Sequence, residues 1–287
     1  MANKRLSVRR LLVLIIVIWF SIIPPIICSC SKDISTDDID DESIWLQELT
    51  SPELNGRKTG TEGAKKTAEF IFSELLRMGH SPFIEDFAYK DSIIMRNIIV
   101  DIPGKNDSII IIGAHYDGAV NSPIYQAAND NASGIISLLS IAKIIQPSQN
   151  SIMLCFWDGE ENTTGTAFNG SSYFLQHFKF GGKIKCYCNI DCCGRNGDSI
   201  YLYYSPDMEH KFGNVDLTSS SLNVIKKVSE SNSSDYVPFK NNGIPFWGWN
   251  DYDVLRYIHT PSDSPEFISI SKVKAVSNLT IQILNNL

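Results

Sequence analysis

The sequence is short of basic residues, and its cysteines lack the spacing of a structural metal site. Lysine and arginine number 25 against 32 aspartate and glutamate residues, which gives a net charge of -7. This acidity argues against nucleic acid or an anionic lipid surface as a partner. None of the seven cysteines is paired at the Cys-x2-Cys spacing of a structural zinc site. The chain also lacks an internal repeat and a second linker, so residues 44–287 suit one domain with a full core.

Five cysteines lie in this domain, at Cys155, Cys186, Cys188, Cys192 and Cys193. Most of them fall in or beside apolar runs, which favours buried thiols on central strands over metal ligands. An odd number leaves at least one thiol free. The spacing alone does not decide whether any disulfide forms.

The amino end combines a charged start with an apolar stretch. Four basic residues precede the stretch at residues 11–27, which Pro24 and Pro25 interrupt, so a stable spanning helix is not expected. The small Ser29 stands directly before Cys30. Residues 1–29 therefore resemble a bacterial lipoprotein signal peptide, which implies cleavage before Cys30, a lipid on its thiol, and an exported protein tethered in the periplasm or at the outer membrane or cell surface. A short uncleaved anchor is the alternative.

Residues 30–43 are acidic and poor in large apolar side chains, which predicts a solvated tether that meets the membrane only through the lipid. Residues 1–29 hold four basic residues and no acidic one. The remaining chain thus has 21 basic and 32 acidic residues and a net charge of about −11. Folding is expected to begin near Ile44.

Apolar runs alternate with amphipathic segments through the domain. Strands are predicted at residues 83–89, 93–100, 109–112, 152–157, 184–190 and 244–249, and helices at 64–78 and 135–145. This alternation predicts an α/β fold, a three-layer α/β/α sandwich with a mostly parallel mixed central sheet.

Polar side chains follow the apolar runs where open α/β sheets bind their ligands. His115, Glu160, Glu161 and Asp191 each come directly after a run, and the last long loop carries His259. We expect these side chains to converge at the carboxyl edge of the sheet, where the parallel strands end. Asp130 precedes the helix at 135–145, so it is either part of this site or only a helix cap.

Two imidazoles and several carboxylates, with no thiolate, suit a zinc-like ion with open positions. The five strongest candidates suffice for two ions if one carboxylate is shared, and Asp130 is best placed to bridge. Consecutive side chains diverge, so one of Glu160 and Glu161 is expected to bind metal while the other acts as general base. Asp117 is placed to support the second nitrogen of His115.

Several blocks occur in a recognisable order. They are His115-Tyr-Asp117, the stretch Asn129-Asp130-Asn131 with Gly134, Gly159-Glu160-Glu161, Asn189-Ile-Asp191, Ser234-Asp235, and His259-Thr-Pro-Ser-Asp263, with a further block at residues 56–61. Together they resemble the co-catalytic zinc aminopeptidases of the bacterial leucyl-aminopeptidase and aminopeptidase S/Y family. The resemblance runs from about residue 56 to the carboxyl end.

The resemblance implies an enzyme of the zinc-exopeptidase fold that hydrolyses residues from peptides with a free amino terminus. One zinc would be held by His115, Asp130 and Asp191, and the other by Asp130, Glu161 and His259. Glu160 would act as general base, and Asp117 would orient His115.

Two departures leave alternatives open. Residues 156–161 and the long loop at 162–170 are also reminiscent of glutaminyl cyclases, which share the fold but use one zinc to form pyroglutamate. A metal-binding domain that has lost catalysis is less favoured, because Glu160 is not needed to hold ions. Ile258 stands where many relatives carry an aromatic residue, so Tyr257 or Tyr252 becomes the candidate to stabilise an oxyanion.

Overall fold

The computed structural model describes residues 40–89, 93–161, 163, 165–213, 215–217, 221–251 and 254–287. The expected signal peptide, most of the tether and Tyr252 lie outside these described residues. Among the helices in the described ranges, none has both the length and the apolar character needed to cross a membrane.

The domain is organised around one eight-stranded sheet. Its strands are β1 (Phe83–Tyr89), β2 (Ile93–Ile102), β3 (Ser108–His115), β4 (Ser151–Trp157), β5 (Lys183–Ile190), β6 (Ser199–Tyr204), β7 (Asn223–Val228) and β8 (Phe246–Asn250). Their spatial order is β1-β2-β4-β3-β5-β8-β6-β7. The central strands β4, β3, β5 and β8 are mutually parallel, whereas β2 and β6 join them antiparallel. The predicted mixed, mostly parallel sheet is confirmed.

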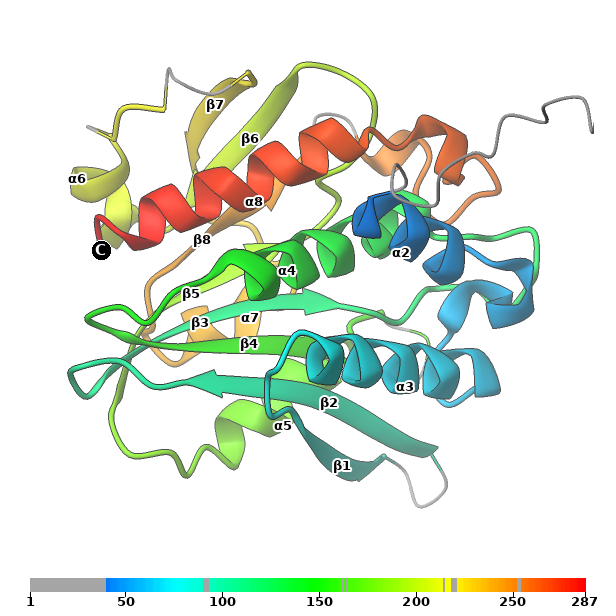
Figure 1. Cartoon of the computed structure of the whole chain (residues 1–287), viewed down its shortest axis with the longest axis horizontal. Helices are drawn as coiled ribbons and strands as arrows, with labels where there is room; N and C mark the ends of the chain where they lie inside the picture. The colour runs from blue at the N-terminus through cyan, green and yellow to red at the C-terminus, as the bar shows by residue number, and fades with distance from the viewer. Residues whose placement is uncertain are drawn as a thin grey trace, which may run out of the picture. The chain divides into compact units, whose positions relative to one another are not determined.

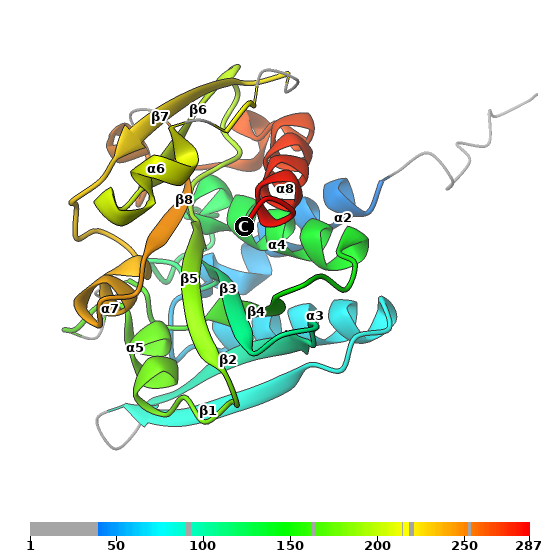
Figure 2. The ribbon, with the colours of Figure 1, turned by 90° about the vertical axis from the view of Figure 1, so that its left-hand side faces the viewer.

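Helices cover both faces of the sheet. One face carries α2 (Asp41–Leu49), α3 (Glu62–Arg77), α4 (Ser133–Ile144) and α8 (Ile270–Leu284), and the other carries α5 (Asn169–Gln176) and α7 (Tyr236–Asn241) (Figure 1). A short helix, α6 (Glu209–Phe212), follows β6. The view turned by 90° shows the sheet between the two helical layers (Figure 2). This is the three-layer sandwich predicted from the alternation of strands and helices.

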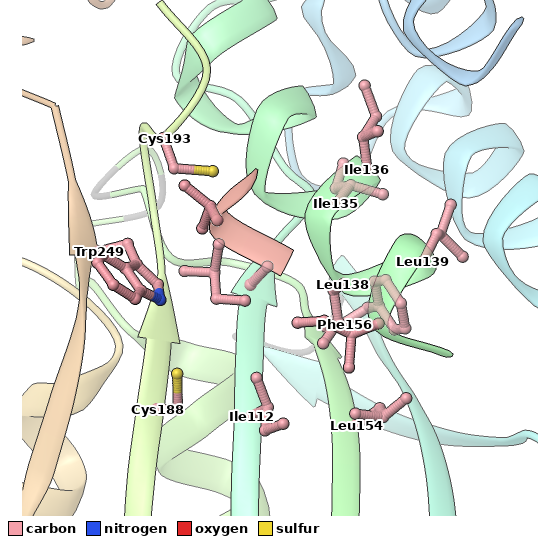
Figure 3. Close-up of a cluster of buried hydrophobic side chains, with 14 of the residues drawn as sticks. Ile112, Ile135, Ile136, Leu138, Leu139, Leu154, Phe156, Cys188, Cys193 and Trp249 are labelled. Atoms are coloured by element: carbon pink, nitrogen blue, oxygen red, sulfur yellow. The ribbon is translucent and has the colours of Figure 1, made fainter. Parts of the chain in front are cut away.

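The central strand β3 is buried on both sides, which explains its uninterrupted run of isoleucine. Ile110 and Ile112 pack into the cluster beneath α4 and α8, whereas Ile109 and Ile111 pack into the cluster beneath α5 and α7. In Figure 3, Ile112 lies in the first cluster, with side chains of α4 such as Leu138 nearby. The rigid strand therefore fixes the position of whatever follows its last residue.

The prediction that the five cysteines are buried thiols is confirmed. All five cysteines of the described chain are buried and free, so none forms a disulfide. Trp247 and Trp249 alternate with Gly248 on β8, and both are buried in the cluster beneath α4 and α8.

The folded domain begins earlier than Ile44. Asp40 caps α2 by accepting a hydrogen bond of 3.0 Å from the backbone N–H of Ser43. Asp41 pairs with Lys143 at 2.7 Å, and Glu42 is buried. These acidic residues were expected in the solvated tether because two of their partners, Lys143 for Asp41 and Lys274 for Asp40, lie more than 100 residues away in the chain and cannot be seen in the local composition.

Candidate metal centre

The ends of three neighbouring parallel strands bring the predicted side chains together. His115 is the last residue of β3, Asp191 directly follows β5, and Glu160 and Glu161 follow β4 after a short turn. His259 reaches the same place from the loop after β8, with 46% of its side chain exposed. The other four side chains are buried.

Asp130 lies between the two imidazoles. Its Oδ1 is 3.2 Å from Nε2 of His115, and its Oδ2 is 3.1 Å from Nε2 of His259. Asp130 belongs to a single turn, Ala128–Ala132, that precedes α4. Asp130 is not a helix cap, because α4 starts at Ser133 and the side chain that accepts a hydrogen bond from its first turn is that of Asn131, from the N–H of Gly134 at 3.0 Å. Each oxygen of one carboxylate thus faces a different histidine.

Two sets of three donors have all their ligand atoms within 4.8 Å of one another: His115, Glu160 and Asp191 in the first, and Asp130, Glu161 and His259 in the second. Within them, Glu161 Oε1 is 2.9 Å from His259 Nε2, and Asp191 Oδ1 is 3.5 Å from His115 Nε2. The adjacent glutamates therefore diverge into different sets. In the first set Glu160 occupies a place that the sequence resemblance gives to Asp130, although Asp130 is also close to His115.

The donor chemistry fits zinc. Glu161 Oε1 and Asp191 Oδ1 are buried and accept no hydrogen bond from the described residues, while both point toward imidazole nitrogens. Buried acceptors of this kind need a cation or a donor. Carboxylates and imidazoles with an accessible side are the ligands of catalytic zinc. Cys192 is also within reach of Asp130 and Asp191, but burial raises the pKa of its thiol well above the usual value.

The electrostatic potential among the carboxylates and imidazoles of the site is negative. Burial and the charge of Asp130 raise the pKa of Glu161 to about 7. The close contacts of its Nε2 with the carboxylates of Asp130 and Glu161 raise the pKa of His259 to about 10. Burial opposes the protonation of His115, but Glu160 and the other surrounding carboxylates raise its pKa well above the usual value. Such a field favours a divalent cation among these side chains.

Asp117 supports the site differently from the sequence expectation. His115 Nδ1 is 3.1 Å from the backbone carbonyl of Asp117 and 3.7 Å from its carboxylate. The carboxylate instead accepts hydrogen bonds from the backbone N–H groups of Glu160, at 3.0 Å, and Glu161, at 3.2 Å. The hydroxyl of Thr59 donates to it at 2.9 Å. Asp117 therefore fixes the turn that carries both glutamates.

Two supporting residues received no role from the sequence. The carboxylate of Asp263 accepts hydrogen bonds from the backbone N–H groups of Asn129, at 2.7 Å, and Asp130, at 3.0 Å. The hydroxyl of Ser234 donates to Asp191 at 2.7 Å. Both residues stand in blocks that carried the family resemblance, which is the signal that marked them.

Tyr257 does not face the site as an oxyanion stabiliser would. Its hydroxyl accepts a hydrogen bond of 3.0 Å from the side-chain amide of Asn129, and the guanidinium of Arg195 covers its ring at 3.6 Å. Neighbouring residues of a loop point in different directions, and here Ile258 rather than Tyr257 lines the cavity. Tyr257 is therefore a structural support for the turn at Asn129. The other candidate, Tyr252, lies outside the described residues.

Arg57 holds the loop that precedes Asp130. It is fully buried, and its guanidinium donates to four backbone carbonyls, those of Leu49, Tyr116, Gln126 and Ala127, at 2.6 to 3.0 Å. Burial lowers its pKa to about 10, while nearby carboxylates, Asp263 and Asp130 first, oppose that shift. Arg57 thus remains a cation that offsets part of the negative charge of the site.

The metal centre lies in the wall of a cavity of about 570 Å³. Besides the predicted site residues, the cavity is lined by Val254, Leu255 and Ile258 of the loop after β8, by residues of β6 and β7, and by the serine-rich segment after β7. Its size lies within the range of small-molecule and peptide-end sites.

Solved structures with this fold are zinc exopeptidases and related enzymes. A Zn-dependent exopeptidase from Parabacteroides distasonis superposes with a TM-score of 0.69 at 18% identity, covering 86% of this chain and 97% of that one. The Fimbriiglobus ruber glutaminyl cyclase gives 0.74 at 18% identity, covering 86% and 94%. BSAP, a zinc aminopeptidase from Bacillus subtilis, gives 0.67 at 16% identity, covering 85% and 94%. The architecture is that of the zinc-exopeptidase fold.

The chain belongs to peptidase family M28, whose family model matches residues 97–284. It is similar to aminopeptidase Y of Saccharomyces cerevisiae, with 28% identity over 63% of this chain and 34% of the relative. It is also similar to aminopeptidase YwaD of Bacillus subtilis, with 26% identity over 80% of this chain and 52% of the relative. The chain thus spans about a third to a half of the length of these relatives.

We predict that Arg57→Met destabilises the domain strongly, because it leaves four backbone acceptors beside the site without their donor. The free energy of unfolding should fall by about 3 kcal/mol or more. Urea denaturation measures the change. Arg77→Met is the matched control, because Arg77 is exposed and pairs with Glu74 on the surface, and it should cost less than about 1 kcal/mol. Equal effects of the two substitutions would contradict the role of Arg57.

Proposed function

We propose that the chain is a zinc-dependent aminopeptidase that hydrolyses residues from the amino end of peptides. The observation that carries the proposal is the position of Asp130, whose two carboxylate oxygens each lie about one hydrogen-bond length from a different histidine, at 3.2 and 3.1 Å. A shared carboxylate between two donor sets is what a site for two cooperating ions requires. Membership of peptidase family M28 and relatives named as aminopeptidases support the same reaction.

His115, Asp130 and Asp191 would hold one zinc, and Asp130, Glu161 and His259 the other. Bound zinc would supply a Lewis acid for the scissile carbonyl and lower the pKa of water. The buried oxygens of Glu161 and Asp191 that lack a donor are the observation that fits this assignment.

Glu160 is the group of the chain that would move the proton. It lines the cavity, and its backbone N–H is held by Asp117, so its carboxylate is presented from a fixed turn. It would take a proton from the attacking water and deliver it to the leaving amine. The apolar side chains of Leu255 and Ile258, beside His259, would keep water from that side of the bound peptide.

The runner-up is a glutaminyl cyclase with one zinc. The stretch at residues 156–161 favours it, and glutaminyl cyclases are among the solved structures of similar fold. Fold alone does not discriminate, because a zinc aminopeptidase and a Zn-dependent exopeptidase also superpose over nearly the same share of the chain. The position of Asp130 between His115 and His259 favours the aminopeptidase, because a single zinc has no need of a carboxylate shared between two donor sets.

The proposal includes the location. Residues 1–29 would direct export as a lipoprotein signal peptide, and residues from Cys30 to the start of α2 would tether the domain to a membrane through a lipid on Cys30. The order of charged start, apolar stretch and Ser29-Cys30 supports this.

The reaction is tested with two substrates. The purified domain should release free amino acid from an apolar dipeptide amide and from a glutaminyl peptide, with two zinc ions bound per chain. The assay follows free amino acid against pyroglutamyl product and ammonia, and elemental analysis counts the metal. If the glutaminyl peptide yields pyroglutamate, neither substrate releases an amino acid, and one zinc is bound per chain, the assignment as an aminopeptidase is wrong and the cyclase takes its place.

Two substitutions separate ligand from general base. Asp130→Asn should lower the zinc content of both sites, because it removes the shared charge. Glu160→Gln should keep zinc near the wild-type content while kcat falls by about 10²- to 10⁴-fold. Metal content and peptide hydrolysis are measured on the same preparations. Loss of most zinc from the Glu160→Gln protein would show that Glu160 is a ligand, as its place in the first donor set allows.

The lipid anchor is tested by labelling producing cells with a tagged fatty acid. The wild-type chain should carry the label, and Cys30→Ala should lose it, because the acylated thiol is removed. Cys28→Ala is the matched control and should keep the label. If the Cys30→Ala protein keeps the label, Cys30 is not the acylated residue.

A further inference from the structure

We propose that Lys227 determines substrate specificity by binding a carboxylate of the peptide, supplied by an acidic side chain or by the carboxyl end of a short peptide. The inference rests on the proposed aminopeptidase function and adds the class of substrate. It assigns a role to the part of the cavity lining that comes from β7.

The charges around the cavity are unevenly distributed. The metal centre contributes four carboxylates and two imidazoles, and the remaining lining is made of hydroxyl, amide, thiol and apolar side chains. Lys227 is the single lysine or arginine among the described residues that line the cavity. Two bound zinc ions would offset the charge of the four carboxylates, so away from the metal centre Lys227 is the place in this lining where an anionic part of a peptide gains an attraction.

The register of the edge strands turns Lys227 toward the cavity. β7 pairs in parallel with β6, and Lys227 lies opposite Tyr203, which also lines the cavity. The hydroxyl of Tyr203 accepts a hydrogen bond from Asn189, and the amide of Asn189 also donates to Ser234, the residue that donates to Asp191. A short series of side chains thus connects the wall at Lys227 with the metal centre.

The adjacent Lys226 shows that the orientation is specific. Successive residues of a strand point to opposite faces, and the ammonium of Lys226 donates to the backbone carbonyls of Gly213 and Val215, at 3.3 and 2.6 Å. By contrast, no acidic residue in the described ranges lies within ion-pair distance of Lys227. Its ammonium is 5.7 Å from the centre of the Tyr201 ring, and Ser229 and Ser231 line the same wall. The wall therefore offers an unneutralised cation together with hydroxyl groups.

A lysine on an edge strand also has a simpler use. β7 is the last strand of the sheet, and exposed lysines on such strands oppose edge-to-edge association. If Lys227 only prevents association between sheet edges, the rate of hydrolysis should not depend on the charge of the substrate. The carboxylate role predicts a dependence that follows the charge at position 227, so the two are separable by experiment.

The test compares three pairs of peptides that differ only in one negative charge. Ala-Ala against Ala-Ala amide tests the carboxyl end, Ala-Glu amide against Ala-Gln amide tests the residue after the scissile bond, and Asp-Ala amide against Asn-Ala amide tests the first residue. The wild type should favour the anionic member of at least one pair by about two- to fivefold in kcat/KM, the size expected for an exposed charge pair. Lys227→Ala should abolish this preference, and Lys227→Glu should invert it.

The matched control is Lys65→Glu, which makes the same change of net charge on the exposed surface of α3 and should leave every ratio unchanged. Ratios that are the same in the wild type, Lys227→Ala and Lys227→Glu proteins would overturn the assignment of Lys227 while leaving peptide hydrolysis intact. Failure of the wild type to release any residue would instead overturn the proposed function. If the wild type is inactive, calorimetry still tests Lys227 by measuring the affinities of the same peptide pairs for the wild-type, Lys227→Ala and Lys227→Glu proteins. The same ratio of affinities within each pair in all three proteins would overturn the role of Lys227.

Discussion

Repulsion among buried carboxylates at the carboxyl edge of the sheet is the constraint that the surrounding structure has to meet. Four such groups lie within a few ångströms of one another, and each like-charge pair at 4 Å costs about 4 kcal/mol at the effective dielectric constant of a protein site. Two imidazoles and the buried guanidinium of Arg57 supply the nearest positive charge. The strands β3, β4 and β5 hold the carboxylates in place, because they are buried on both faces and have no freedom to relax apart.

The supporting groups act mainly on the backbone. Asp117 binds two N–H groups of the turn with Glu160, Asp263 binds two N–H groups of the turn with Asp130, and Arg57 binds the carbonyls that lead into that turn. Each connects segments that are 40 or more residues apart in the chain. Fixing the backbone holds the two turns in place, while the side-chain oxygens of Glu160 and Asp130 remain available to face a cation.

The sequence predicted the part of the molecule that depends on local pattern. The isoleucine run of β3 and its neighbours predicted buried parallel strands, and the residues following them converge as expected. Three features escaped prediction because they depend on distant partners. Asp40 and Asp41 belong to the domain through Lys274 and Lys143, the carboxylate of Asp117 turns to the glutamates, and Tyr257 turns to Asn129. The strand β7 was missed because it is an exposed edge strand with little apolar alternation, whereas β6 is mostly buried and its run of aromatic and aliphatic residues was overlooked.

The parts of the sheet that line the cavity differ in how freely they can change, which bears on how one fold can carry more than one reaction. The metal end of the cavity is built from central strands, whose burial on both faces leaves little room for change. Much of the remaining lining comes from β6, β7 and the segment after β7, which lie at or next to the edge of the sheet, where substitution is better tolerated. Differences in substrate among proteins of this fold are therefore expected at the edge, where one exposed lysine can change which peptides bind without disturbing a single carboxylate of the metal centre.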